Sequence, residues 1–141
     1  MDQICEALGA TATDFDFKTE CCGASFSISN TEVVESLSGK ILEMAKESGA
    51  HAIVVACPLC QSNLDMRQPD IEKLQGVKYG IPVFYFTQLM ALAFGYPIDQ
   101  LKFPKHIIPV EGALANIGKV DPSAEKTKKT TKAVKAESEV Q

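Results

Sequence analysis

Four of the five cysteines in this 141-residue chain lie in two short stretches. Cys21 and Cys22 are adjacent and precede a glycine, and Cys57 and Cys60 are spaced C-x-x-C in the segment CPLC. In a chain of ordinary globular composition, with 45% hydrophobic and 23% charged residues, such pairs are typical of metal ligands or redox centres. We therefore expect a fold that brings these two stretches together.

Charge and hydropathy argue against several classes of partner. The net charge of −4 does not favour a nucleic acid or an anionic membrane surface. The longest apolar run, residues 81–97, is interrupted by Gln88 and Gly95 and is not expected to span a bilayer. The first ten residues hold two acids and no basic segment, so we expect a cytoplasmic chain rather than a secreted one. Reduced thiols are the norm there, which argues against a disulfide framework.

The composition changes at Lys119, which divides the chain into two regions. Residues 1–118 have the mixture expected of one folded domain. Residues 119–141 hold six lysines, four acids and only three apolar residues larger than alanine. Such a segment cannot bury enough apolar surface to offset its ordering entropy, so we predict a disordered Lys-rich tail.

Hydrophobic periodicity predicts alternating helices and strands in the first region. A short helix ends at Gly9, and a long one begins after Asn30 and ends at Gly49, with an apolar stripe formed by Val34, Leu37, Ile41, Met44 and Ala45. The apolar runs HAIVVA (51–56) and PVFYF (82–86) suit buried strands. One helix is expected to begin near Leu59 and another after a Thr87 cap. This order predicts an α/β fold, a small parallel sheet with flanking helices.

The predicted layout places the cysteines where ligands usually bind. Cys57 follows the first strand at the turn into a helix, and Cys21 and Cys22 precede the loop that leads to the long helix. In open parallel sheets, ligands gather at the carboxyl ends of the strands. We therefore expect the site at that edge.

Four thiolates are the usual ligands of a 2Fe–2S or 4Fe–4S cluster. A C-x-x-C turn at a helix start offers free backbone N–H groups to the thiolates, and Pro58 fixes one φ of that turn. Gly23 lets the backbone approach a bulky centre. Adjacent cysteines suit a single tetrahedral ion poorly, because successive side chains of an extended chain point to opposite faces. The pattern favours a polynuclear cluster over zinc.

Three other interpretations of the cysteines remain open. Structural zinc usually shows two C-x-x-C pairs, and only one is present here. A thioredoxin-type dithiol would use Cys57 and Cys60 and leave the CC pair unexplained. Buried cysteines also serve as small hydrophobes. We expect that role for Cys5, which shares a helix face with Leu8.

Several polar and apolar residues are weaker candidates. His51 and His106 are expected to be structural. Asp65 and Arg67 could tune a centre, bind a partner or form a solvated helix face, and Gln88 could reach the site or cap its helix. The large apolar side chains near the site are expected in the core or at an interface: Met66, Leu89, Met90, Leu92 and Phe94.

Three segments together resemble a known family: TECCGASFSISN, HAIVVACPLCQSNLDMRQ and IPVFYFTQLMALAFGYP. Residues 1–110 are similar to the cysteine-rich CCG domain in the carboxyl-terminal half of the B subunit of heterodisulfide reductase. The resemblance implies an α/β fold in which Cys21, Cys22, Cys57 and Cys60 bind a noncubane 4Fe–4S cluster. It also implies an oxidoreductase that reduces the mixed disulfide of coenzyme M and coenzyme B, with electrons from partner subunits that carry flavin and ferredoxin-like clusters.

The chain departs from the family pattern in one respect. The family motif has a further cysteine a few tens of residues before the CC pair, and Cys5 lies too close to fill that position. A whole B subunit carries the motif twice, so we expect a half-subunit that is inactive alone and that pairs with the missing amino-terminal half. Related CCG domains of quinone-linked and 2-hydroxyacid oxidoreductases imply an alternative, a non-catalytic electron-transfer or assembly module. A zinc-stabilised interaction domain is the third hypothesis.

Overall fold

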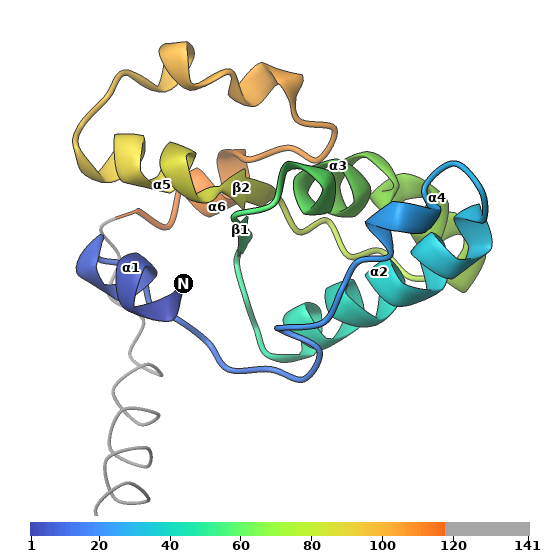
Figure 1. The fold of residues 1–141 in the computed structure, drawn as a ribbon. Coiled ribbons are helices and arrows are strands. Elements are labelled where there is room, and N and C mark those ends of the chain that lie inside the picture. Colours follow the sequence, from blue (N-terminus) through green and yellow to red (C-terminus); the bar gives the residue numbers. More distant parts are fainter. Residues whose placement is uncertain (118–141) are drawn as a thin grey trace, which may run out of the picture.

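The computed structural model describes residues 1–117, and the predicted tail at 119–141 lies outside this range. Within it, a pair of short strands is surrounded by helices (Figure 1). The strands are β1 (Ile53–Val55) and β2 (Val83–Tyr85). The α-helices are α1 (Asp2–Ala7), α2 (Thr31–Glu47), α3 (Pro58–Met66), α4 (Gln68–Gln75), α5 (Phe86–Ala93) and α6 (Glu111–Leu114). Three short 3₁₀ helices are η1 (Ala24–Phe26), η2 (Ile98–Leu101) and η3 (Phe103–Lys105).

The two strands are parallel, which confirms the predicted fold class. Ile53 pairs with Val83 and Val55 with Tyr85. The connection between the strands runs through α3 and α4, as a parallel pair requires a crossover. Helices α2, α3 and α4 lie on one side of the strands, and α5 and α6 lie on the other (Figure 1).

Alternation along the strands gives each face of the sheet its own core. Ile53, Val55 and Val83 pack into the larger cluster, which includes Leu42, Leu64 and Ile71 from the helices on that side. Phe84, whose side chain points to the opposite face, packs with Phe103 and Val110 in a smaller cluster. The period-2 pattern of the strands therefore places helices on both faces of the sheet.

The long helix α2 begins and ends as its sequence predicts. The Asn30 side chain accepts a hydrogen bond from the Val33 N–H at 3.3 Å. At the other end Gly49 adopts a φ of +75°, and the Ala50 N–H bonds the Ala45 carbonyl at 3.1 Å, a Schellman closure. Of the predicted stripe, Val34, Ile41 and Ala45 are buried, and Leu37 and Met44 are half-buried. Leu42, outside the predicted stripe, is fully buried as well. Ser38 and Gly39 of α2 are also buried.

Helix α4 is absent from the sequence prediction. It begins directly after Arg67, and its first residue Gln68 is fully buried. The Gln68 amide nitrogen donates to the carbonyls of Leu64 and Ile81, and its oxygen accepts from the Ile81 N–H at 2.9 Å. This buried amide fastens α4 to the segment that enters β2. The burial of Gln68 could not be predicted from the sequence, because a glutamine at a helix start usually faces solvent.

Helix α5 begins two residues earlier than predicted. Tyr85 stands at the N-cap position and Thr87 lies inside the helix, so the predicted Thr87 cap is wrong. The Gln88 side chain accepts from the Tyr85 N–H at 2.9 Å, which satisfies one donor at the helix start.

Among the helices of residues 1–117, none has the length and apolar character to cross a lipid bilayer.

Candidate metal centre

The C-P-L-C segment forms the turn from β1 into α3. Cys57 is the N-cap residue with an extended backbone, and Pro58 is the first residue of the helix. The Cys57 thiol is exposed. The backbone N–H of Cys60, with that of Leu59, lowers the pKa of Cys57 below its ordinary value. A thiolate is therefore favoured at this helix start, as expected for a ligand position.

The two adjacent cysteines of the CCG segment face different surroundings. Cys22 is 1% exposed and packs in the larger core cluster, whereas Cys21 is exposed. The Gly23 N–H donates to the Cys21 sulfur at 3.4 Å. The Ser38 hydroxyl of α2 donates to the Cys22 carbonyl at 3.1 Å and fixes this backbone to the long helix.

The structure brings the two cysteine stretches together. The Sγ atoms of Cys22 and Cys60 are 3.3 Å apart, although the residues are 38 positions apart in sequence. Burial, with the neighbouring Cys22 and Cys57 thiols, raises the pKa of Cys60 to about 12. Cys22 of the CCG segment and Cys60 of the turn after β1 thus meet near the carboxyl end of that strand.

The two cysteine stretches supply thiols, the donor type that iron–sulfur clusters use. Within residues 1–117, no three His, Cys, Asp or Glu side chains are arranged to hold a single metal ion. The buried Cys22 contacts the half-buried Cys60, and Cys21 and Cys57, on the same two stretches, are exposed. Four thiolates are the usual ligand set of an iron–sulfur cluster. Metal binding would deprotonate them, including Cys60.

A polar network that the sequence analysis missed adjoins the cysteines. The Asn63 amide donates to the Cys22 sulfur at 3.6 Å, and its oxygen accepts from the Ser27 hydroxyl at 3.2 Å. Asn63 is 5% exposed. Its position three residues after Cys60, on the same helix face, is the sequence signal that could have identified it.

Asp65 and Arg67 both hold the fold together. The buried Asp65 carboxylate accepts from the N–H groups of Ile107 and Ile108 at 2.8 and 3.1 Å, so the expectation of a solvated helix face is wrong for this residue. The Arg67 guanidinium donates to the Ser27 carbonyl at 2.9 Å.

Gln88 and the histidines lie elsewhere. The Gln88 amide nitrogen contacts the Leu101 carbonyl and the His106 ring. Its amide oxygen accepts a hydrogen bond from the Tyr85 N–H at the start of α5. These contacts favour the helix-capping alternative. His106 stacks near Phe84 and Phe103, which suits the structural role expected for it. His51 is exposed before β1.

Cys5 and the apolar candidates divide between core and surface. Cys5 is buried in α1, and burial raises its pKa, as suits a core thiol. Leu92 packs against the smaller cluster, and Leu89 and Met90 are half-buried. Met66 and Phe94 are 60% and 71% exposed. The last two are therefore candidates for an interface.

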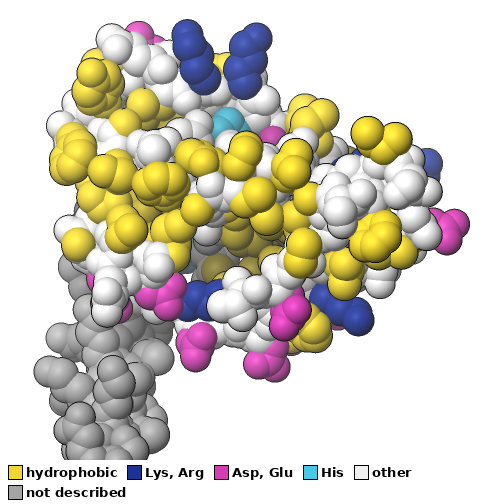
Figure 2. All heavy atoms as spheres, viewed as in Figure 1, with side chains coloured by type: hydrophobic (Ala, Val, Ile, Leu, Met, Phe, Trp, Pro, Cys, Tyr) yellow, Lys and Arg dark blue, Asp and Glu magenta, His cyan; other side chains and the backbone are white. Residues whose placement is uncertain are grey.

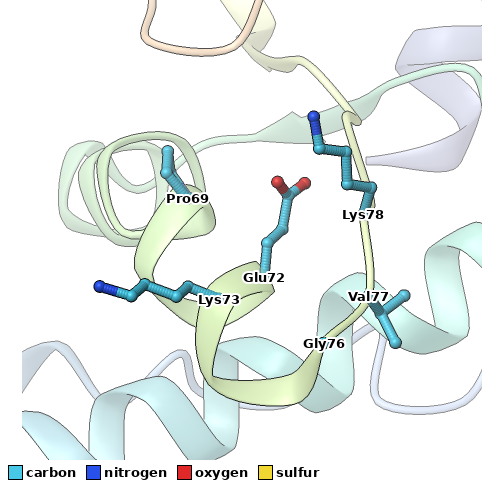
Figure 3. A pocket seen from close by; sticks show the side chains of 6 residues that line it. All are labelled: Pro69, Glu72, Lys73, Gly76, Val77 and Lys78. Carbon is cyan, nitrogen blue, oxygen red and sulfur yellow. The ribbon is translucent and has the colours of Figure 1, made fainter.

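A surface hollow elsewhere on the molecule is explained by structural contacts. It lies at the end of α4, lined by Glu72, Lys73 and Lys78 among others (Figure 3). In Figure 3 the Glu72 side chain points between the helix and the segment that follows it. Its carboxylate accepts from the N–H groups of Tyr79 and Gly80 at 2.7 and 2.9 Å. No cysteine lines this hollow.

The sequence of this chain matches a known protein family. The family model described as a cysteine-rich domain, CCG, matches residues 1–65. Residues 1–65 are similar to the CCG domain. The match includes both cysteine stretches and ends within α3. The resemblance expected from the motifs is confirmed.

Relatives extend the similarity beyond the CCG domain. The B subunit of a ferredoxin/F420H2-dependent CoB–CoM heterodisulfide reductase from Methanosarcina acetivorans is 34% identical over 118 residues, 82% of this chain. A protein from Archaeoglobus profundus, described as similar to the B subunit of heterodisulfide reductase, is 32% identical over 102 residues, 70% of this chain. An 8-methylmenaquinol:fumarate reductase membrane anchor subunit from Wolinella succinogenes is 34% identical over 107 residues, 76% of this chain.

The chain spans about two fifths of the length of the curated relatives that it matches. The aligned regions are 39%, 34% and 38% of the Methanosarcina, Archaeoglobus and Wolinella proteins. The similarity therefore relates this chain to parts of oxidoreductase subunits.

Proposed function

We propose that this chain is an iron–sulfur subunit, or part of one, in a heterodisulfide reductase-like complex. Cys21, Cys22, Cys57 and Cys60 would hold a 4Fe–4S cluster, which we expect to be of the noncubane type. The complex would reduce a small-molecule disulfide of the CoM–S–S–CoB type to two thiols, with two electrons delivered through partner subunits.

The contact between Cys22 and Cys60 is the observation that carries this proposal. Two sulfurs from stretches 38 residues apart lie 3.3 Å from each other beside two further thiols. An iron–sulfur cluster at such a place stores and passes single electrons. The relatives named as heterodisulfide reductase subunits support disulfide reduction as the reaction that would use them.

An apolar face around the site supports a role inside a complex. Yellow apolar side chains gather over α5 and extend toward α3 (Figure 2). Leu59, which lies between the two cysteines of the C-x-x-C turn, is 56% exposed, and Phe94 and Tyr96 are 71% and 57% exposed. Large exposed apolar patches mark protein interaction sites. We propose partner subunits there, and a tagged copy of the chain expressed in its native cell should co-purify with them.

Anaerobic reconstitution tests the cluster. With ferrous iron and sulfide, the full chain should bind about four irons, the content of one 4Fe–4S cluster. Cys57→Ser should lose most of this iron, because a hydroxyl is a poor iron ligand at neutral pH. Cys5→Ala is the matched control, since it removes a thiol outside the site and should keep the iron. Iron content by mass spectrometry and the visible absorption of the product are measured. A colourless, iron-free wild-type chain would contradict the proposal.

A second candidate function is a non-catalytic electron-transfer module of a quinone-linked oxidoreductase. The similarity to the Wolinella anchor subunit favours it. Reduction of a panel of small-molecule disulfides by the reconstituted chain, with its co-purified partners and a chemical electron donor, separates the two. Disulfide reduction that depends on Cys57 supports the leading proposal. Loaded iron that is reduced and reoxidised without thiol production supports the second.

A further inference from the structure

Asn63 is the only side chain of the described residues whose nitrogen donor contacts a cysteine sulfur. It lies on α3, one turn after Cys60, and is 5% exposed. Its amide nitrogen is 3.6 Å from the Cys22 sulfur. A buried amide costs free energy unless its donors and its acceptor are hydrogen-bonded, and the Cys22 sulfur is the partner of one Asn63 donor.

A second hydrogen bond sets the direction of the amide. The Ser27 hydroxyl donates to the Asn63 oxygen at 3.2 Å, which leaves the NH₂ group facing Cys22. Arg67, the residue directly after α3, donates to the Ser27 carbonyl at 2.9 Å and holds Ser27 in place. A thiolate only accepts hydrogen bonds, so this orientation is the one that a deprotonated Cys22 requires.

We propose that Asn63 is a positioning residue that tunes the iron–sulfur centre through Cys22, with Ser27 keeping the amide oriented. This inference rests on the proposed function, because it concerns a thiolate that binds the cluster. An N–H donor withdraws negative charge from the sulfur and stabilises the reduced, more negative form of the centre. Hydrogen bonds to cluster sulfurs and the second layer of residues are known determinants of reduction potential.

The test is a reductive titration of the reconstituted full chain. Asn63→Asp has nearly the same shape but replaces the donor with an acceptor and adds negative charge. Asn63→Gln keeps an amide but moves it by one methylene, and Ser27→Ala keeps the donor but frees its orientation. Ser62→Ala is the matched control on the same helix, because Ser62 is exposed and its hydroxyl contacts only Met66. Iron content and the midpoint potential with dithionite and redox mediators are measured for each protein.

We expect Asn63→Asp to keep its iron and to lower the ratio of reduced to oxidised centre at fixed potential about tenfold, which is about 59 mV for one electron. Ser27→Ala and Asn63→Gln should shift the potential in the same direction by less, and Ser62→Ala should match the wild type. Should Asn63→Asp fail to load, the Ser27→Ala and Asn63→Gln shifts decide the inference by themselves.

Two results overturn the inference alone, and a third refutes the proposed function on which it rests. Loaded variants with the wild-type potential show that Asn63 does not tune the centre. Loss of iron from all three variants, with Ser62→Ala loaded, assigns the network to building the site alone. An iron-free wild-type chain refutes the proposed function, and the inference falls with it.

Discussion

The thiols of the C-x-x-C turn have opposite tendencies to ionise. Cys57 lies exposed at the start of α3, where backbone N–H groups stabilise its thiolate. Cys60 sits one turn inside, where burial and the sulfurs of Cys22 and Cys57 disfavour a negative charge. A centre that neutralises this charge would remove the cost at Cys60. In the proposed site, Cys57 would therefore bind metal first, and Cys60 would depend most on the metal.

This difference predicts selective alkylation of the reduced, metal-free chain. At pH 8 iodoacetamide should modify Cys57 at least about tenfold faster than Cys60, because only the thiolate reacts. The Cys57 rate should rise with pH and level off once the pH exceeds its lowered pKa, while Cys60 stays a thiol until pH approaches about 12. Both residues lie in one tryptic peptide, so fragment spectra assign the label. Equal rates at the two positions would refute the assigned environments.

At the scale of elements, the CCG turn is held against α2. Gly23 has a φ of +80°, and a Cβ atom there would lie 3.1 Å from the Leu37 side chain and 3.3 Å from the Val34 backbone. The Ser38 hydroxyl on the same helix binds the Cys22 carbonyl. The close approach of turn and helix is what places Cys22 beside Cys60. A glycine is needed there for both its backbone conformation and its small size.

Gly23→Ala should therefore destabilise the metal-free chain for two reasons. The left-handed backbone costs about 1–2 kcal/mol for alanine, and overpacking against α2 adds about 1–3 kcal/mol. Gly9→Ala is the matched control, because Gly9 has a φ of +88° with no atom within 4 Å of the added Cβ. Urea unfolding gives the free energy of each variant. Equal losses at the two glycines would show that contact with α2 does not matter.

At the scale of the whole molecule, Asp65 joins the two halves of the structure. It lies on α3, which packs on the larger core, and it binds the backbone of Ile107 and Ile108 in the segment between η3 and α6. That segment borders the smaller core around Phe84 and Phe103. The helix that begins with the cysteine turn is thus anchored to both sides of the sheet. Such anchoring keeps α3 rigid under the site.

Asp65→Ala should loosen this anchor. Two backbone N–H groups lose their acceptor, and we expect a loss of about 2–3 kcal/mol in the free energy of unfolding. Asp16→Ala is the control, since Asp16 is exposed and should change stability by less than about 0.5 kcal/mol. Urea unfolding measures both. Hydrogen exchange should be faster at the amides of Ile107 and Ile108, and unchanged protection there would contradict the assigned role.

Local sequence signals determined the elements that depend on neighbouring residues. The Asn30 cap, the Gly49 stop, the two apolar runs and the Pro58 turn follow from propensities and hydrogen bonds within a few residues. The position of Cys57 at the end of a strand follows from them. The CCG and C-x-x-C motifs, together with the resemblance they support, indicated an iron–sulfur protein before any contact was known.

Tertiary structure decided the contacts between distant residues. The meeting of Cys22 with Cys60, the Asn63 amide on the Cys22 sulfur and the Asp65 anchor link positions 38, 41 and 42 or more residues apart. No local pattern distinguishes a buried Asp65 or Gln68 from an exposed one, because each is a polar residue on a helix, and the spacing of Asn63 from Cys60 indicates a shared helix face but not its contacts. Their roles arise only when α3 and α4 pack against the sheet and α2, where burial makes each unpaired polar group costly.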